Sequence, residues 1–153
     1  MEYKDWGHER TDFHPKKFCE KVLIEINCDF VGLALQNNDG PDVKWHYAAG
    51  NSNNKYMRIT VRYGKGIAGK VIATGSPMIV EGFPQQILGK PLEYPIMLAE
   101  KLVTAFAVPI HFNSLPKGVL LVGKRTNQPF SKSEQRAVLK AAKYLEEKMV
   151  RGM

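Results

Sequence analysis

An apolar stripe of helical period opens the hydrophobic pattern of the chain. Phe18, Val22 and Ile26 recur every four residues, a spacing that places side chains on one face of an α-helix. Pro15 precedes them and suits the first helical turn, where the backbone N–H that proline lacks would have no partner inside the helix. We expect a helix over 15–27 with this stripe on the core.

A second apolar pattern lies near the C-terminal end. Ser131 and Glu134 have the spacing of a capping box, in which two residues satisfy each other's backbone amides at a helix start. The apolar positions that follow alternate between four- and three-residue spacing: Val138, Ala142, Leu145 and Met149. Such a seam suits a helix packed on a sheet, and it equally suits a face that joins two copies of the chain.

Shorter apolar segments between these helices predict strands. They cover 30–35, 43–47, 57–63, 78–80, 104–112 and 119–123. Turn-forming residues separate the first three segments, which we therefore expect as an antiparallel meander. Pro109 lies inside the fifth segment, and because proline cannot donate to a sheet ladder, a bulge or an unpaired position is expected there. Two short helices are predicted, at about 67–74 and from Tyr94 onward.

The order of these elements predicts an α+β fold. We expect one central antiparallel sheet of five or six strands, with the N- and C-terminal helices on one face and a ligand pocket on the other. The length of 153 residues suits a single domain, assigned to 15–153. Residues 1–14 are polar and aromatic without a period, and we predict that they form a flexible arm.

Composition and charge exclude several function classes. No apolar run approaches the roughly 20 residues of a membrane span, and the polar start lacks a signal-peptide core, so we expect a cytoplasmic protein. The net charge is +7, but Lys and Arg are spread out and no nucleic-acid-binding motif accompanies them. We expect neither nucleic acid nor a membrane as partner. The charge suits a solvated basic surface, and an acidic protein or a small anion as partner is the alternative. Cys19 and Cys28 predict small buried hydrophobes, and two cysteines cannot make a structural zinc site.

The glycine-rich stretch 64–69 is the strongest sign of a ligand pocket. Its glycines run straight into the apolar pattern of a short helix, and glycine adopts backbone angles that other residues avoid. The first amides of a helix have no partner inside it, so such an end attracts anions. No nucleophile–base pair, paired carboxylates or Walker-type phosphate loop is visible, which favours a binding protein over an enzyme.

A set of ordered motifs resembles the GAF-domain family. The matching segments are 64–69, 74–80, 107–110, 117–120 and 128–131 with Glu134. The resemblance spans about residues 15–150 and implies a single GAF domain. A further set of segments is similar to the NreA-type nitrate receptors within that family: 42–47, 50–51, 64–69, 94–96 and 124–129.

This second likeness implies a cytoplasmic nitrate receptor. In that family the nitrate-free receptor restrains an oxygen-sensing histidine kinase of a two-component system, and nitrate relieves the restraint. The expected partners are nitrate or a similar small anion and a sensor histidine kinase, with a homodimer through the terminal helices as a further expectation. We expect no cofactor and no metal besides the anion.

Three segments supply groups that suit nitrate, a flat and weakly hydrated anion with three acceptor oxygens. The candidate ligand-binding residues are Trp45, Gly66, Ile67, Ala68, Gly69, Tyr94, Pro95 and Ile96. The helix start at 66–69 offers amides at a partial charge of about +0.5. Tyr94 offers a hydroxyl and Trp45 a flat wall with an N–H donor, so the site needs no fixed cation. Trp45 and Tyr94 also suit an ordinary core, and the combination carries the prediction.

Two other functions remain open at this point. Some stand-alone GAF proteins reduce free methionine sulfoxide, which requires reactive cysteines around the pocket. Cys19 and Cys28 precede the pocket segments, and residues 64–112 contain no cysteine, which counts against a reductase. The other alternative is a GAF sensor for another small ligand. The motif set of cyclic-nucleotide GAF domains and the pocket cysteine of bilin-binding ones are both absent, but nitrite or a small carboxylate could use the same donors.

Overall fold

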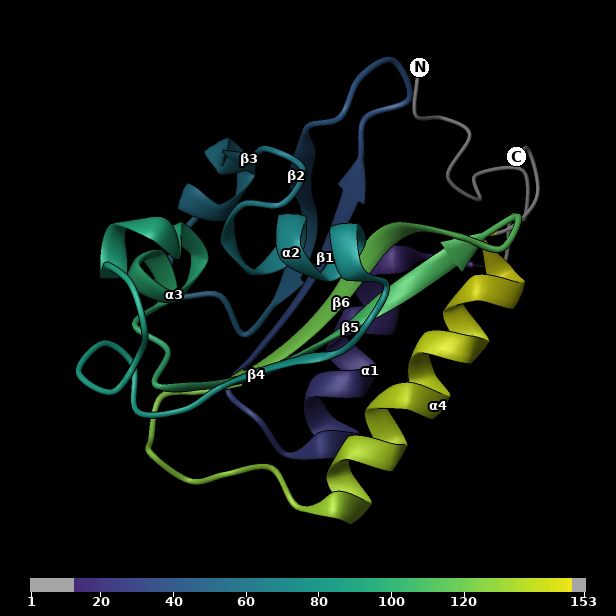
Figure 1. Ribbon diagram of the computed structural model, residues 1–153. Helices are drawn as coiled ribbons and strands as arrows, with labels where there is room; N and C mark the ends of the chain where they lie inside the picture. The colour runs from purple at the N-terminus through teal and green to yellow at the C-terminus, as the bar shows by residue number, and fades with distance from the viewer. Residues whose placement is uncertain (1–12, 150–153) are drawn as a thin grey trace.

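The computed structural model describes residues 13–149. Within this range the chain forms one sheet with helices on both faces (Figure 1). The elements are α1 (Pro15–Ile26), β1 (Phe30–Gln36), β2 (Val43–Ala49), η1 (Lys55–Arg58), β3 (Thr60–Val61), α2 (Gly66–Thr74), β4 (Met78–Val80), η2 (Pro91–Glu93), α3 (Pro95–Glu100), β5 (Thr104–Phe112), β6 (Leu115–Lys124) and α4 (Lys132–Lys148).

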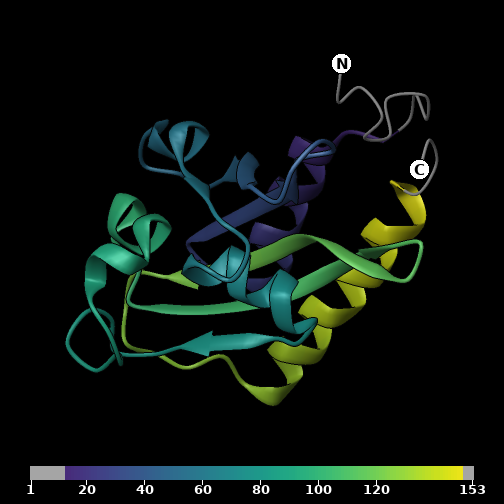
Figure 2. The ribbon, with the colours of Figure 1, turned by 45° about the horizontal axis from the view of Figure 1, so that its top comes forward.

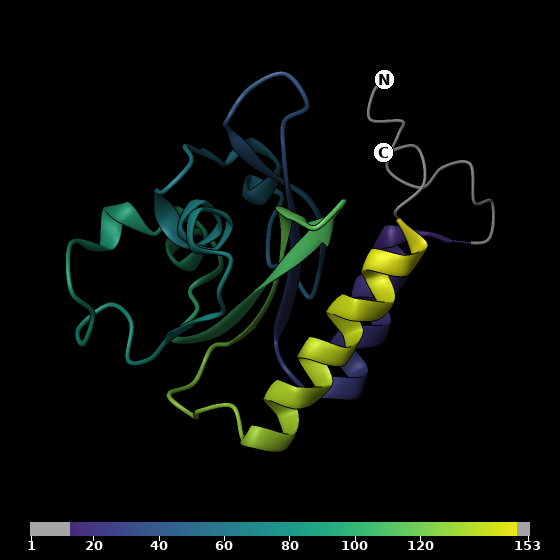
Figure 3. The same ribbon diagram turned by 45° about the vertical axis from the view of Figure 1, so that its right-hand side comes forward.

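The six strands follow the order β3-β2-β1-β6-β5-β4, and every neighbouring pair is antiparallel. Helices α1 and α4 lie side by side on one face of the sheet, as Figure 3 shows. Helix α2 crosses the opposite face (Figure 2), and α3 lies toward one end of the sheet. The α+β fold, the strand number and the placement of the terminal helices are confirmed.

The sheet separates two buried clusters. Successive side chains of a strand point to opposite faces, so each central strand contributes to both clusters. Leu33 and Leu120 lie in the cluster that packs against α1 and α4, here called the helix-face cluster. Ala34 and Val119 lie in the cluster that packs against α2 and α3, here called the site-face cluster.

The C-terminal seam packs on the chain's own sheet. Its apolar residues are at most 4% exposed and belong to the helix-face cluster: Val138, Ala142, Leu145 and Met149. The capping box that predicted this helix is present, with the Glu134 amide donating to Ser131 Oγ at 3.0 Å. Of the two roles that suited the seam, the structure assigns packing against the sheet.

Two strand predictions were wrong in extent. The predicted strand at 57–63 is the 3₁₀ helix η1 followed by the two-residue strand β3. The Tyr56 side chain is buried in the site-face cluster, whereas Met57 is 51% exposed. The alternation of buried and exposed side chains that predicted a strand therefore applies only to the residues after Met57. Strand β6 starts four residues earlier than predicted, because a tight turn at Asn113 and Ser114, both with positive φ, replaces the longer turn.

The predicted irregularity in β5 is present but displaced. Pro109 itself pairs with Val119, and the register shifts between Ile110 and His111. The shift therefore falls one residue beyond the proline that predicted it.

Most of the predicted arm, residues 1–12, lies outside the described residues. Phe13 is partly buried against the helix-face cluster, with its ring centroid 6.0 Å from that of Phe18. The described chain thus begins in contact with the core. None of the helices between residues 13 and 149 is long and apolar enough to cross a membrane.

Candidate functional site

Trp45 is held against the sheet by a glycine on the neighbouring strand. It lies on β2 opposite Ala34 of β1 and is 2% exposed. A Cβ placed on Gly32 would come within 2.9 Å of the Trp45 indole, so only glycine leaves room for the ring there. This arrangement fixes the indole within the site-face cluster, in the layer shared with α2 and α3.

The glycine turn leads into three amides at the start of α2 that have no partner inside the helix. Gly66 has a φ of 64°, in the left-handed region that glycine adopts more easily than other residues. The turn is closed by a hydrogen bond in which the Gly64 amide donates to the Gly69 carbonyl at 2.9 Å. Because α2 begins at Gly66, the amides of Gly66, Ile67 and Ala68 have no partner inside the helix, whereas the Gly69 amide is the first to bond within it. No side chain caps this end. The Gly69 carbonyl therefore closes the turn that precedes the helix.

The start of α3 adds one amide and one hydroxyl. Tyr94 precedes the helix, and its carbonyl accepts from the Met97 amide at 3.0 Å. Pro95 has no N–H, so the Ile96 amide is the donor of this helix start that lacks a partner inside the helix. With six residues α3 is short, and its contribution is this single amide rather than a large dipole.

The fold brings the three predicted segments together. A Cβ on Gly66 would lie 3.7 Å from the Glu93 carbonyl oxygen, so the start of α2 faces the residue before Tyr94. The larger predicted residues share the site-face cluster and are at most 5% exposed: Trp45, Ile67, Ala68, Tyr94 and Ile96. The side chains of the three predicted segments therefore meet in one buried layer.

Lys70 belongs to this arrangement and was missed from the sequence. Its Nζ donates to the Tyr94 hydroxyl oxygen at 3.2 Å and lies 4.9 Å from the centre of the Tyr94 ring. The sequence pattern indicated no cation at the site, whereas the structure places the Lys70 ammonium beside the Tyr94 hydroxyl. Its position in the sequence could have indicated this role, because Lys70 follows Gly66 by one helical turn and lies on the same side of α2.

Both cysteines lie on the other side of the sheet. Cys19 is fully buried, and Cys28 packs against the same helix-face cluster. Burial raises the pKa of Cys19 to about 12 and that of Cys28 to about 11. Both thiols are protonated at neutral pH and are poor nucleophiles. Neither contributes to the site-face cluster around Trp45.

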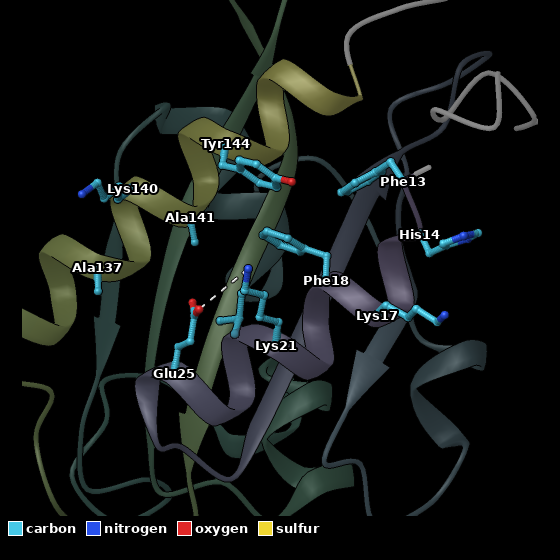
Figure 4. Close-up of a pocket in the computed structure, with 11 residues that line it drawn as sticks. Phe13, His14, Lys17, Phe18, Lys21, Glu25, Ala137, Lys140, Ala141 and Tyr144 are labelled. Atoms are coloured by element: carbon cyan, nitrogen blue, oxygen red, sulfur yellow. Dashed lines mark ion pairs between the residues drawn. The ribbon is translucent and has the colours of Figure 1, made fainter. Parts of the chain in front are cut away.

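A separate cavity opens between α1 and α4 (Figure 4). It has a volume of about 510 Å³, and its walls come from Phe13 to Glu25 on one side and from Ala137 to Tyr144 on the other. This cavity lies on the face opposite Trp45 and is not part of the predicted anion site. Between residues 13 and 149, no group of three or more His, Cys, Asp or Glu side chains is placed to hold a metal ion.

Comparison with protein-family models gives no match, and comparison with curated proteins gives none. Solved structures do match. A mutated NreA protein from Staphylococcus aureus, altered in its nitrate-binding site, shares 34% identity with a TM-score of 0.70. The match covers 76% of this chain and 87% of that one.

Two more distant structures share the fold alone. The GAF domain of a phosphoenolpyruvate-protein phosphotransferase from Acinetobacter is 14% identical, with a TM-score of 0.71 over 88% of this chain and 78% of that one. Free methionine-R-sulfoxide reductase from Neisseria meningitidis is 16% identical, with a TM-score of 0.71 over 88% and 74%. The fold they share and the much higher identity to NreA lead to one assignment. The chain belongs to the NreA family of GAF-fold proteins.

Proposed function

We propose that the chain is a receptor for nitrate or a similar small anion, bound where α2, α3 and β2 meet. One observation carries the proposal. Ile67, Ala68 and Ile96, whose amides have no partner inside their helices, belong to the same buried cluster as Trp45 and Tyr94. The likeness to a protein with a nitrate-binding site supports the identity of the anion.

The chemistry of these groups suits a weakly hydrated monoanion. Backbone amides and a hydroxyl supply donors in several directions, and the indole supplies a flat apolar wall. A helix start carries a partial charge of about +0.5, and the Lys70 ammonium adds to it. An anion that gives up little hydration enters such a site more readily than sulfate, because desolvation opposes binding. We expect micromolar affinity, about −8 kcal/mol.

Calorimetry with nitrate, nitrite, sulfate and chloride tests the proposal directly. We expect nitrate to bind with the highest affinity. Ala68→Pro removes an amide donor at a helical position that tolerates proline, and it should weaken nitrate binding. Ala68→Gly is the matched control because it keeps the amide. Absence of heat with nitrate, or equal affinity for chloride, would contradict the proposal.

We further propose that this receptor acts in the cytoplasm on a sensor histidine kinase of a nitrate- and oxygen-responsive two-component system. A receptor without catalytic groups must pass its ligand state on through protein contacts. The segment 81–93 leads into the start of α3 and carries Leu88 and Leu92, which are 91% and 82% exposed. A shift of this segment on anion binding would change the surface that a kinase meets.

Reconstitution with a purified sensor kinase tests this second step. We expect the nitrate-free receptor to lower kinase autophosphorylation and nitrate to restore it. A Leu88→Glu and Leu92→Glu variant should still bind nitrate in calorimetry but lose its effect on the kinase. Unchanged kinase activity with the wild-type receptor, with and without nitrate, would contradict a regulatory role.

We propose that the chain is not an enzyme. The reductase alternative is supported only by a shared fold at 16% identity. Against it stand two protonated thiols on the helix face of the sheet. A thiol-dependent methionine sulfoxide reductase assay should show no turnover. Turnover that is lost in Cys28→Ser would establish the alternative instead.

A further inference from the structure

We propose that the cavity between α1 and α4 is a docking groove for an acidic amphipathic helix of a partner protein. The groove runs between two antiparallel helices. The side chains of Phe18, Lys21 and Tyr144 point into the space between them, whereas those of Lys17 and Lys140 point outward from its edges (Figure 4). It lies on the face of the sheet opposite the anion site. The proposal therefore does not depend on which ligand that site binds.

The floor of the groove is apolar. The rings of Phe18 and Tyr144 stack with centroids 6.1 Å apart and planes 10° apart, closing one end. Ala137 and Ala141 are the residues that α4 presents further along, and their small side chains leave a channel of about 510 Å³. Tyr144 remains 48% exposed. A channel of this kind accepts the apolar face of a third helix, with anchors at helical spacing.

The rim of the groove is positive. Lys17, Lys21 and Lys140 line it, and the one carboxylate among its lining residues is Glu25. Lys21 Nζ lies 4.0 Å from Glu25 Oε2, so this carboxylate already has a cation beside it. Lysine stems extend along apolar surface while their ammonium groups stay in water, so they are placed to meet carboxylates at the edge of a docked helix. Charge complementarity therefore selects an acidic partner.

The same charges argue against a second copy of this chain as the occupant. In a two-fold dimer the same patch meets itself, so each lysine rim would face another lysine rim. Like charges brought together at an interface oppose association. The apolar seam of α4 is already buried against the sheet, so the seam itself is not free to join two copies.

A designed peptide tests the groove on the whole protein. The probe is a fluorescein-labelled peptide as long as α4, 17 residues, with leucine at helical spacing and glutamate on both flanks. Fluorescence anisotropy should show saturable binding that weakens as salt is raised. Lys140→Glu should weaken it about tenfold, whereas Lys143→Glu, the same change on the same helix outside the groove, should leave it almost unchanged. Ala137→Trp should block it, because Ala137 is exposed and tryptophan fills the channel.

Circular dichroism of each variant establishes that it is folded. Three results would overturn the proposal: no binding of the acidic peptide to the wild type, equal binding of a peptide with lysine in place of glutamate, or equal weakening by Lys140→Glu and Lys143→Glu. Sedimentation supplies a fourth. A wild-type dimer that Ala137→Trp converts to a monomer would assign the groove to a second copy of the chain.

Discussion

At the residue scale, the contact between Lys70 and Tyr94 determines the direction in which the Tyr94 hydroxyl can donate its proton. The Lys70 ammonium lies 3.2 Å from the Tyr94 oxygen, and an ammonium group has donors but no acceptor. The tyrosine oxygen therefore accepts this bond, and its own proton is left for another acceptor. A bound anion is the acceptor that the proposed function supplies. At the proposed site, Lys70 would act on the anion through Tyr94 as well as by its charge.

Replacement of Lys70 should weaken nitrate binding more than it changes the fold. We expect Lys70→Met to raise the nitrate Kd about tenfold, because a charge-assisted hydrogen bond contributes about 1.5–3 kcal/mol. Lys70→Arg keeps the charge and the donors and should bind nearly as well as the wild type. In a Tyr94→Phe background the effect of Lys70→Met should shrink, since the partner is gone. Equal affinities of Lys70→Met and the wild type in calorimetry would remove Lys70 from the site.

The raised pKa of the buried Cys19 thiol predicts how the stability of the protein changes in alkaline solution. Its pKa is about 12 in the folded chain, against 9.0 for an ordinary thiol. Between these values the unfolded chain releases the proton while the folded chain keeps it. This contribution to stability is therefore complete below about pH 9 and is lost as pH rises to about 12, with a slope of about 1.4 kcal/mol per pH unit.

Urea unfolding of the wild type and of Cys19→Ala at a series of pH values checks this prediction. Other titrating groups are common to both proteins, so the difference isolates the thiol. The free energy of unfolding should fall less steeply for Cys19→Ala above pH 9. Parallel curves for the two proteins would show that Cys19 does not titrate differently in the folded and unfolded chains.

At the element scale, Arg125, the residue after β6, joins the end of this strand to three other segments, through Asp29, Gly50 and Glu100. Its guanidinium donates to the Glu100 carboxylate at 2.6 Å and to the Gly50 carbonyl at 3.1 Å. Its backbone amide donates to Asp29 at 2.7 Å. Glu100, the last residue of α3, is fully buried, and its second carboxylate oxygen has no partner among the described residues. This contact fixes the end of the helix whose start carries Tyr94.

Loss of the Arg125 side chain should destabilise the protein substantially. Arg125→Met leaves the Glu100 carboxylate buried without its cation, and removing one partner of a buried ion pair costs about 3–5 kcal/mol. Part of the arginine side chain, 31%, remains exposed, so we expect about 3 kcal/mol. The double variant Arg125→Met with Glu100→Leu should recover part of the loss. Arg136→Met, on an exposed position of α4, is the control in urea unfolding.

The elements also show which parts of the fold the sequence pattern could predict. Periodicity and capping residues located α1 and α4 closely, because those signals are local. The prediction of a strand at 57–63 was wrong because burial of Tyr56 in a tertiary cluster overrides the local alternation of apolar and polar residues. Lys70 was missed for a related reason. Its partner Tyr94 is 24 residues away, and only the packing of α2 against the start of α3 brings them together.

At the scale of the whole molecule, the two proposed sites lie on opposite faces of one sheet. The proposed anion donors lie on the face covered by α2 and α3, and the lysine-rimmed groove lies on the face covered by α1 and α4. Strands β1, β5 and β6 contribute side chains to both buried clusters. A ligand that orders one face therefore stabilises the sheet that supports the other.

Nitrate should accordingly raise the thermal stability of the whole domain. A ligand at 100 times its Kd that binds only the folded state adds about 2.7 kcal/mol. For a chain of this size each kcal/mol moves the unfolding midpoint by about 2–4 °C, so we expect a rise of about 5–10 °C. Scanning calorimetry in chloride, with and without nitrate at matched ionic strength, measures it. Tyr94→Phe should reduce the rise, whereas Lys140→Glu should keep it in full, because the groove lies on the opposite face from the anion site. A rise that Lys140→Glu lowers as much as Tyr94→Phe would show that the anion binds at the basic groove instead.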